Sequence, residues 1–106
     1  MVNNKIFGLI GFAARARKIA FGADSVESEI LKKKVKVVIM AEDASQRTKD
    51  KFNKICNENN IPIIEIGKIE ELSKAIGKSN KAIIGVEEKN LSIEIQKIYN
   101  GGEGIG

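Results

Sequence analysis

The chain has 106 residues, of which 42% are hydrophobic and 30% are charged, a composition that predicts one folded domain and excludes a disordered chain. Its single cysteine, Cys56, excludes an intrachain disulfide and favours a cytoplasmic location. We expect no membrane partner, because no apolar run approaches the roughly 18–20 residues of a membrane span and no signal peptide is evident.

Residue types that commonly carry catalysis are scarce. The sequence has no His and no Trp, whereas general acid–base catalysis and zinc sites usually draw on His or on several Cys. Neither the GxxxxGK nor the GxGxxG phosphate loop occurs at its proper spacing. We therefore expect no enzymatic activity, no metal, no cofactor and no small-molecule substrate.

Positive charge is concentrated in the first half of the chain. The formal net charge is +4, with 12 Lys and Arg against 6 Asp and Glu in residues 1–54, and 6 against 8 in residues 55–106. Such an uneven distribution is typical of a surface that binds an anionic partner. An ordinary solvated lysine-rich surface explains it equally well, so charge alone leaves both interpretations open.

In chain order, the first predicted elements are a helix over about residues 4–17, a short strand over residues 18–21 and a second helix. Gly8 and Gly11 weaken the first helix, so either they permit close packing or the helix relies on tertiary contacts. Asp24 with Glu27 three residues later is a capping pattern, which predicts that the second helix begins with Asp24 as its N-cap. This helix ends in the cations of residues 32–34, and its predicted inward residues are Val26, Ile30 and Leu31.

The middle of the chain carries the clearest strand. Residues 35–41 contain a continuous β-branched-rich run, which is typical of a strand buried on both faces. A helix is predicted over about residues 45–59, and we expect Glu42 and Asp43 in the preceding turn to complement its dipole. Phe52 and Cys56 are expected on the core side of this helix. On its other side we predict a solvated stripe of Arg47, Lys51 and Lys54.

The last predicted elements are a strand over residues 61–66, a short helix over residues 68–76, a strand over residues 81–86 and a helix over residues 91–99. Residues 100–106 are rich in glycine and have no apolar pattern, so we expect a flexible tail. The alternation of helix and strand over residues 1–99 predicts a single α/β domain, with a sheet of about four strands and helices on both faces.

Five segments carry a family resemblance, in a shared order and spacing that spans roughly residues 5–98: GFAARARKIAFG (11–22), VVIMAEDAS (37–45), IPI (61–63), AIGK (75–78) and AIIGV (82–86). On these segments the sequence resembles the L7Ae family of ribosomal and kink-turn RNA-binding proteins, and most of all its small bacterial members. The resemblance implies a three-layer α/β/α sandwich with a four-stranded mixed sheet. It also implies a non-catalytic protein that recognises and stabilises kinked RNA, with the ribosome as a candidate partner.

The resemblance places the RNA-facing surface on residues 22–28, at the start of the second helix, and on a second loop at residues 77–80. A helix N-terminus offers unpaired N–H groups and partial positive charge, so an RNA phosphate can dock there. The alternative interpretation is that Gly22 and Asp24 only turn and cap the helix. With the neighbouring cations included, the predicted RNA-binding residues are Lys18, Gly22, Ala23, Asp24, Ser25, Val26, Ser28, Lys32, Gly77, Lys78 and Ser79.

The sequence departs from the strongest kink-turn binders at three positions of this surface. Those proteins carry Asn, Glu and Lys where Asp24, Ser25 and Ser28 stand here. An Asn amide or a Lys can donate to guanine O6 or N7, whereas an ionised Asp only accepts, for instance from guanine N1 and N2. Two hypotheses follow. One is a binder of structured RNA, ribosomal or otherwise kinked, and the other is a protein-interaction module of the same fold with weakened RNA recognition.

Overall fold

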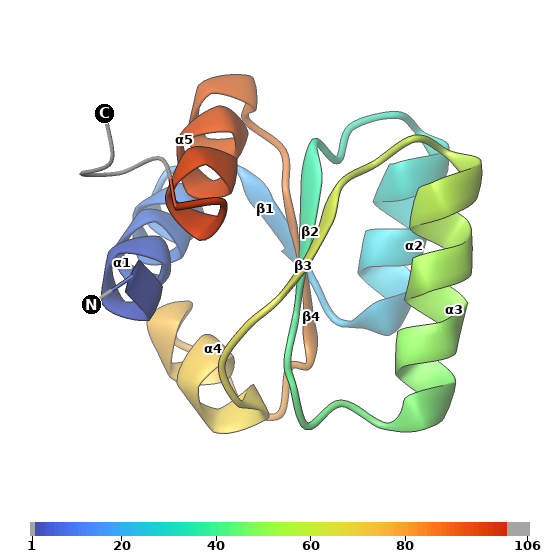
Figure 1. The fold of residues 1–106 in the computed structure, drawn as a ribbon, viewed down its shortest axis with the longest axis horizontal. Helices are drawn as coiled ribbons and strands as arrows, with labels where there is room; N and C mark the ends of the chain where they lie inside the picture. The colour runs from blue at the N-terminus through green and yellow to red at the C-terminus, as the bar shows by residue number, and fades with distance from the viewer. Residues whose placement is uncertain (1, 102–106) are drawn as a thin grey trace.

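The computed structural model describes residues 2–101, which contain five helices and four strands (Figure 1). The helices are α1 (Val2–Arg15), α2 (Ala23–Leu31), α3 (Gln46–Glu58), α4 (Ile69–Ala75) and α5 (Lys89–Tyr99). The strands are β1 (Ile19–Phe21), β2 (Val37–Met40), β3 (Ile63–Glu65) and β4 (Ile83–Val86). Every predicted element is present within three residues of its predicted bounds. Most of the predicted tail, residues 102–106, lies outside the described residues.

The four strands form one mixed sheet in the order β1-β4-β2-β3. β2 pairs in parallel with β3, whereas β4 runs antiparallel to both β1 and β2. Helices α1, α4 and α5 cover one face of the sheet, and α2 and α3 cover the other (Figure 1). The predicted three-layer α/β/α sandwich with a four-stranded mixed sheet is therefore confirmed. Within residues 2–101, no helix combines the length and the apolar character needed to cross a membrane.

Strand β2 separates two apolar clusters. All four of its residues are buried. Val37 and Ile39 belong to the cluster beneath α1, α4 and α5, whereas Val38 and Met40 belong to the cluster beneath α2 and α3. This alternation follows from the two-residue period of a strand, and it confirms the predicted burial of β2 on both faces.

Two glycines allow helices to approach their neighbours closely. A Cβ at Gly11 would lie 3.0 Å from the Ala75 carbonyl oxygen, so this glycine lets α1 pack against α4. A Cβ at Gly85 would lie 3.1 Å from the nearest Val35 methyl group and 3.3 Å from Val26, so this glycine lets α2 settle on β4. Of the two weakening glycines in α1, only Gly11 serves close packing, because the space around Gly8 is open within 4 Å.

Helix α3 has a buried and a solvated side, as predicted. Phe52 and Cys56 are buried, and burial raises the pKa of the Cys56 thiol to about 11, as expected for a thiol in apolar surroundings. Arg47, Lys51 and Lys54 are exposed. Lys51 extends toward α2, where its Nζ lies 2.9 Å from Glu27 Oε1.

Helix α2 differs from its prediction at both ends. Its N-cap is Gly22 and no side chain caps it, so Asp24 is the second residue of the helix and the predicted capping pair with Glu27 is wrong. The helix begins earlier because Gly22, with a φ of 88°, turns the chain directly after β1. The predicted inward position of Leu31 is also wrong, since its side chain is 66% exposed. Val26 and Ile30 define the buried side, and Leu31 lies about 100° around the helix from Ile30.

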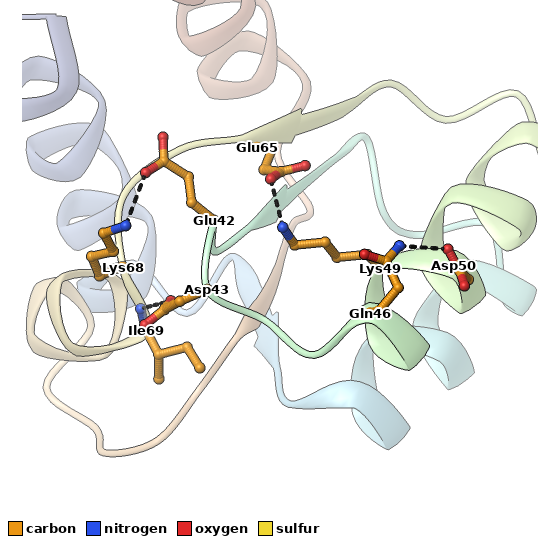
Figure 2. Close-up of polar contacts among 8 residues, drawn as sticks. All are labelled: Glu42, Asp43, Gln46, Lys49, Asp50, Glu65, Lys68 and Ile69. Atoms are coloured by element: carbon orange, nitrogen blue, oxygen red, sulfur yellow. Dashed lines mark hydrogen bonds and ion pairs between the residues drawn. The ribbon is translucent and has the colours of Figure 1, made fainter.

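The two acids in the turn after β2 contact the start of α4 and not that of α3 (Figure 2). Asp43 Oδ1 accepts a hydrogen bond of 2.8 Å from the N–H of Ile69, the first residue of α4. Glu42 Oε1 lies 3.6 Å from Lys68 Nζ, just before that helix. The N-cap of α3 is Ser45, whose side chain accepts from the Thr48 N–H. The prediction that Glu42 and Asp43 complement α3 is therefore wrong, because a contact across 26 residues has no local sequence signature.

We predict that Asp43→Ala lowers the free energy of unfolding by about 1 kcal/mol, as for other lost helix caps. The matched control is Glu42→Ala, which removes only an exposed ion pair and is expected to cost about 0–0.5 kcal/mol. Urea denaturation of both variants measures the difference. Equal destabilisation by the two substitutions would contradict a capping role for Asp43.

Candidate functional site

The N-terminal end of α2 is open. The space that a Cβ of Gly22 would occupy has no atom within 4 Å, and Ala23, Asp24 and Ser25 are exposed. The first helical hydrogen bond runs from the Val26 N–H to the Gly22 carbonyl oxygen at 3.0 Å. The N–H groups of residues 23–25 precede that bond and point out of the helix end. This end therefore presents donors and partial positive charge to an anion.

The loop between α4 and β4 is held in place by a buried serine. Ser73 is 2% exposed, and its Oγ accepts from the Lys81 N–H at 2.7 Å and donates to the Lys81 carbonyl oxygen at 3.2 Å. The Ser73 carbonyl oxygen accepts from the Lys78 N–H at 2.8 Å. Gly77 and Asn80 take positive φ angles of 71° and 56° as the loop turns. The loop is thus fixed at both ends while residues 77–80 stay exposed.

The two predicted loops meet at Phe21, the last residue of β1. Lys78 Nζ lies 5.1 Å from the centre of the Phe21 ring, and Lys81 Nζ lies 5.6 Å from it. Among the described residues, neither ammonium forms an ion pair within 4.0 Å. The β1–α2 and α4–β4 connections both lie at the lower end of the sheet in Figure 1. Two cations, Lys78 of the predicted second loop and Lys81, therefore lie beside Phe21, two residues before the start of α2.

Two predicted site residues lie elsewhere, and the side chain of a third is buried. Lys32 is the C-cap of α2, about 13 Å along the helix from its N-terminal end at 1.5 Å per residue, and its Nζ lies 3.4 Å from Glu29. Lys18 precedes β1 at the opposite end from Gly22, and its carbonyl oxygen accepts from the Glu87 N–H at 2.7 Å. Val26 is fully buried in the core, so its side chain is not available to a ligand. Ser28, in contrast, is exposed on the same helix.

The sequence prediction missed Phe21 and Lys81. Both come to the site because β4 runs antiparallel to β1, with Phe21 opposite Ile84 and the Gly22 N–H donating to Ile83. This pairing places the residues that precede β4 beside the residues that follow β1. The sequence signal was Lys81, the basic residue at the start of the last predicted strand. Placing it beside Phe21 required knowledge of the strand order.

A groove of about 470 Å³ runs between β1 and α2. Its lining residues are Ile19, Ala20, Phe21, Asp24, Ser25, Ser28, Glu29 and Glu87. Glu29 and Glu87 share a side-chain hydrogen bond, and burial together with this bond raises the pKa of Glu87. The same hydrogen bond, with help from Lys32, lowers the pKa of Glu29. The residues from 2 to 101 contain no group of three or more His, Cys, Asp or Glu placed to hold a metal ion.

Comparison with known proteins shows one matching family and two relatives with similar sequences. The model of the ribosomal protein L7Ae/L30e/S12e/Gadd45 family matches residues 4–95. The chain is 34% identical over 86 residues to the RNA-binding protein YlxQ of Bacillus subtilis, covering 81% of this chain and 86% of that protein. It is 30% identical over 97 residues to the RNA-binding protein YlxQ of Enterococcus faecium, covering 92% and 93%.

Two solved structures share the fold. A protein with unknown function from Bacillus halodurans C superimposes with a TM-score of 0.87 and 32% identity, over 91% of this chain and 97% of that one. The 15.5kD RNA binding protein of Giardia lamblia superimposes with a TM-score of 0.83, over 94% of this chain and 88% of that one. At 20% identity, the second comparison concerns the fold alone.

We predict that Ser73→Ala lowers the free energy of unfolding by about 1–3 kcal/mol, because the partly buried Lys81 N–H loses its acceptor. The amide NMR signals of residues 78–82 are expected to shift in the same variant. The exposed Ser79 of the same loop supplies the control, and Ser79→Ala is expected to leave stability within about 0.5 kcal/mol. Unchanged loop signals in the Ser73 variant would contradict the positioning role of Ser73.

Proposed function

Because the chain belongs to the ribosomal protein L7Ae/L30e/S12e/Gadd45 family, we propose that it is a non-catalytic RNA-binding protein that stabilises a sharply bent RNA. Relatives that match over most of the chain are named RNA-binding proteins. The observation that carries the proposal is the open N-terminal end of α2, with the ammonium groups of Lys78 and Lys81 over the ring of Phe21, two residues before the helix.

In this proposal the RNA backbone binds at the end of α2. A phosphate accepts hydrogen bonds from the N–H groups of residues 23–25, where the helix dipole favours negative charge. The absence of a side chain at Gly22 leaves room for close approach of the sugar-phosphate chain. Lys78 and Lys81 then neutralise neighbouring phosphates on the two sides of the bend. These contacts position the RNA without reading its sequence.

We propose that side chains on the exposed side of the first turn and a half of α2 recognise the RNA bases. Asp24, Ser25 and Ser28 are exposed there, spaced so that residues 24 and 28 lie on one side of the helix. The Asp24 carboxylate accepts from guanine N1 and N2, and the serine hydroxyls both donate and accept. The protein acts by binding the bent conformation more tightly than the extended one, which shifts the equilibrium of the RNA toward the bend.

The proposed partner is a kinked RNA in the cytoplasm, in the ribosome or in another structured transcript. The proposed binding unit is the single α/β domain of residues 1–99. This function needs no cofactor and no small-molecule substrate.

The proposal is tested with a kink-turn RNA that carries a donor and an acceptor fluorophore on its two arms. Adding the protein at low salt is expected to raise energy transfer, because the arms come together. The double variant Lys78→Ala, Lys81→Ala is expected to weaken binding about tenfold or more. It should also flatten the dependence of log K on log salt by roughly 1.5–2, as for two lost phosphate contacts.

The matched control is Lys89→Ala with Lys97→Ala, which removes two exposed cations from α5 on the other face of the sheet. Affinity and salt dependence are expected to stay within about twofold of the wild type. If no RNA bends or binds at low salt, or if the α5 variant weakens binding as much as the loop variant, the proposed function is wrong.

The departures at positions 25 and 28 give a gain-of-function test. Ser25→Glu with Ser28→Lys restores the residue types of strong kink-turn binders on two exposed positions. We expect about tenfold or greater improvement in kink-turn affinity, since each base contact contributes roughly 1–3 kcal/mol. A filter-binding assay against a kink-turn RNA and a straight duplex measures it. Equal gains on both RNAs would show a nonspecific phosphate contact of the new lysine and not base recognition.

A further inference from the structure

Strand β1 presents unpaired backbone groups at the edge of the sheet. It is the first strand in the order β1-β4-β2-β3 and pairs only with β4. The Lys18 carbonyl oxygen and the Gly22 N–H bond to β4, so the alternating pattern of an antiparallel pair turns the N–H and C=O groups of Ile19 and Phe21 outward. Within residues 2–101, no backbone group pairs with them.

The groove lies directly along this free edge. Ile19, Ala20 and Phe21 form one wall, while Asp24, Ser25, Ser28 and Glu29 of α2 form the other, with Glu87 beyond the end of β4. Its volume of about 470 Å³ falls within the range of ~300–1,000 Å³ that is typical of ligand sites. The edge of three residues suits a short extended segment.

The acidic side chains that line the groove favour a cationic ligand. Three of its lining side chains are carboxylic acids, namely Asp24, Glu29 and Glu87. Glu29 and Glu87 lie close enough to interact directly, and burial together with this contact raises the pKa of Glu87. Lys32 Nζ lies 3.4 Å from Glu29 Oε2, with 60% of the Lys32 side chain exposed, and Lys18 and Lys34 act on the pair without a direct ion pair. An ammonium or guanidinium group near Glu29 and Glu87 is attracted by these carboxylates, whereas a phosphate at the same place is repelled.

We propose that this groove binds an extended, lysine- or arginine-rich segment of a partner protein, which adds to β1 as a fifth strand. The backbone of the segment pairs with Ile19 and Phe21, as in other cases of strand addition to a sheet edge. One of its cationic side chains reaches the Glu29 and Glu87 carboxylates, and apolar side chains on alternate positions pack on Ile19. This activity differs from RNA binding in its key contacts, which are the backbone edge of β1 and the Glu29 and Glu87 carboxylates, although Asp24, Ser25 and Ser28 line the groove as well as the proposed RNA surface.

The test uses a fluorescent, terminally blocked peptide with the sequence Val-Lys-Val-Lys-Val. We expect saturable binding with shifts of the Ile19 and Phe21 amide signals in a ¹⁵N–¹H spectrum. The same peptide with N-methylated backbone amides should bind at least about tenfold more weakly, because it cannot pair with the strand. A peptide with Glu in place of Lys should not bind. Equal binding of the N-methylated peptide would overturn strand addition.

Protein variants test the charge requirement. Glu29→Gln with Glu87→Gln keeps the hydrogen-bonding capacity of the pair but removes its charge, and it should weaken peptide binding about tenfold or more. RNA affinity should not fall in this variant. The control Glu70→Gln with Glu94→Gln removes two exposed acids from α4 and α5 and should leave peptide affinity unchanged.

The results also separate this proposal from RNA binding. If RNA shifts the Ile19 and Phe21 signals while the peptide shifts neither, the groove belongs to the RNA surface and the inference is wrong. If the peptide binds as described but no RNA binds, the inference stands and the proposed RNA function fails. Loss of peptide binding in the Glu70 and Glu94 variant would show nonspecific attraction and would also overturn the inference.

Discussion

Gly22 leaves the sheet with a φ of 88°, and its N–H donates to the Ile83 carbonyl oxygen at 2.9 Å. Residues other than glycine rarely adopt this backbone conformation, and the hydrogen bond fixes the turn to β4. Together they set the direction in which α2 starts, so that its first N–H groups face outward and not into the core. The same bond brings the loop before β4 beside Phe21. The open helix end, the two lysines and the groove along β1 all follow from this one turn.

Charge divides this part of the molecule into surfaces with different preferences. The α4–β4 connection lies at the lower end of the sheet in Figure 1, and its Lys78 and Lys81, which lie over the Phe21 ring just before α2, favour an anion. Along β1, the acids Glu29 and Glu87 favour a cation. The lysines that follow α2 gather at the opposite end of that helix, where Glu29 contacts Lys32. A phosphate is therefore favoured at the helix end and disfavoured beside Glu29 and Glu87.

The layers and most elements were predictable because their signals are local. The β-branched run of β2 and the helical period of α3 reflect burial on two faces and on one face, respectively. The errors concern features that depend on distant partners. Asp43 caps a helix 26 residues away, and Leu31 follows the last buried position of α2. The open helix end at Gly22 was predictable from the family pattern. Lys18 and Lys32 were assigned to it by closeness in sequence, whereas strand pairing supplies Phe21 and Lys81 instead.

The most direct test of the central claim is a ¹⁵N–¹H titration of the protein with an unlabelled kink-turn RNA. We expect the largest amide shifts at Gly22, at residues 23–25 and in the loop at residues 77–81. We expect little change at residues 32–36 and on α5. Shifts that centre on residues 32–36 or on α5, with residues 22–25 unmoved, would contradict the central claim.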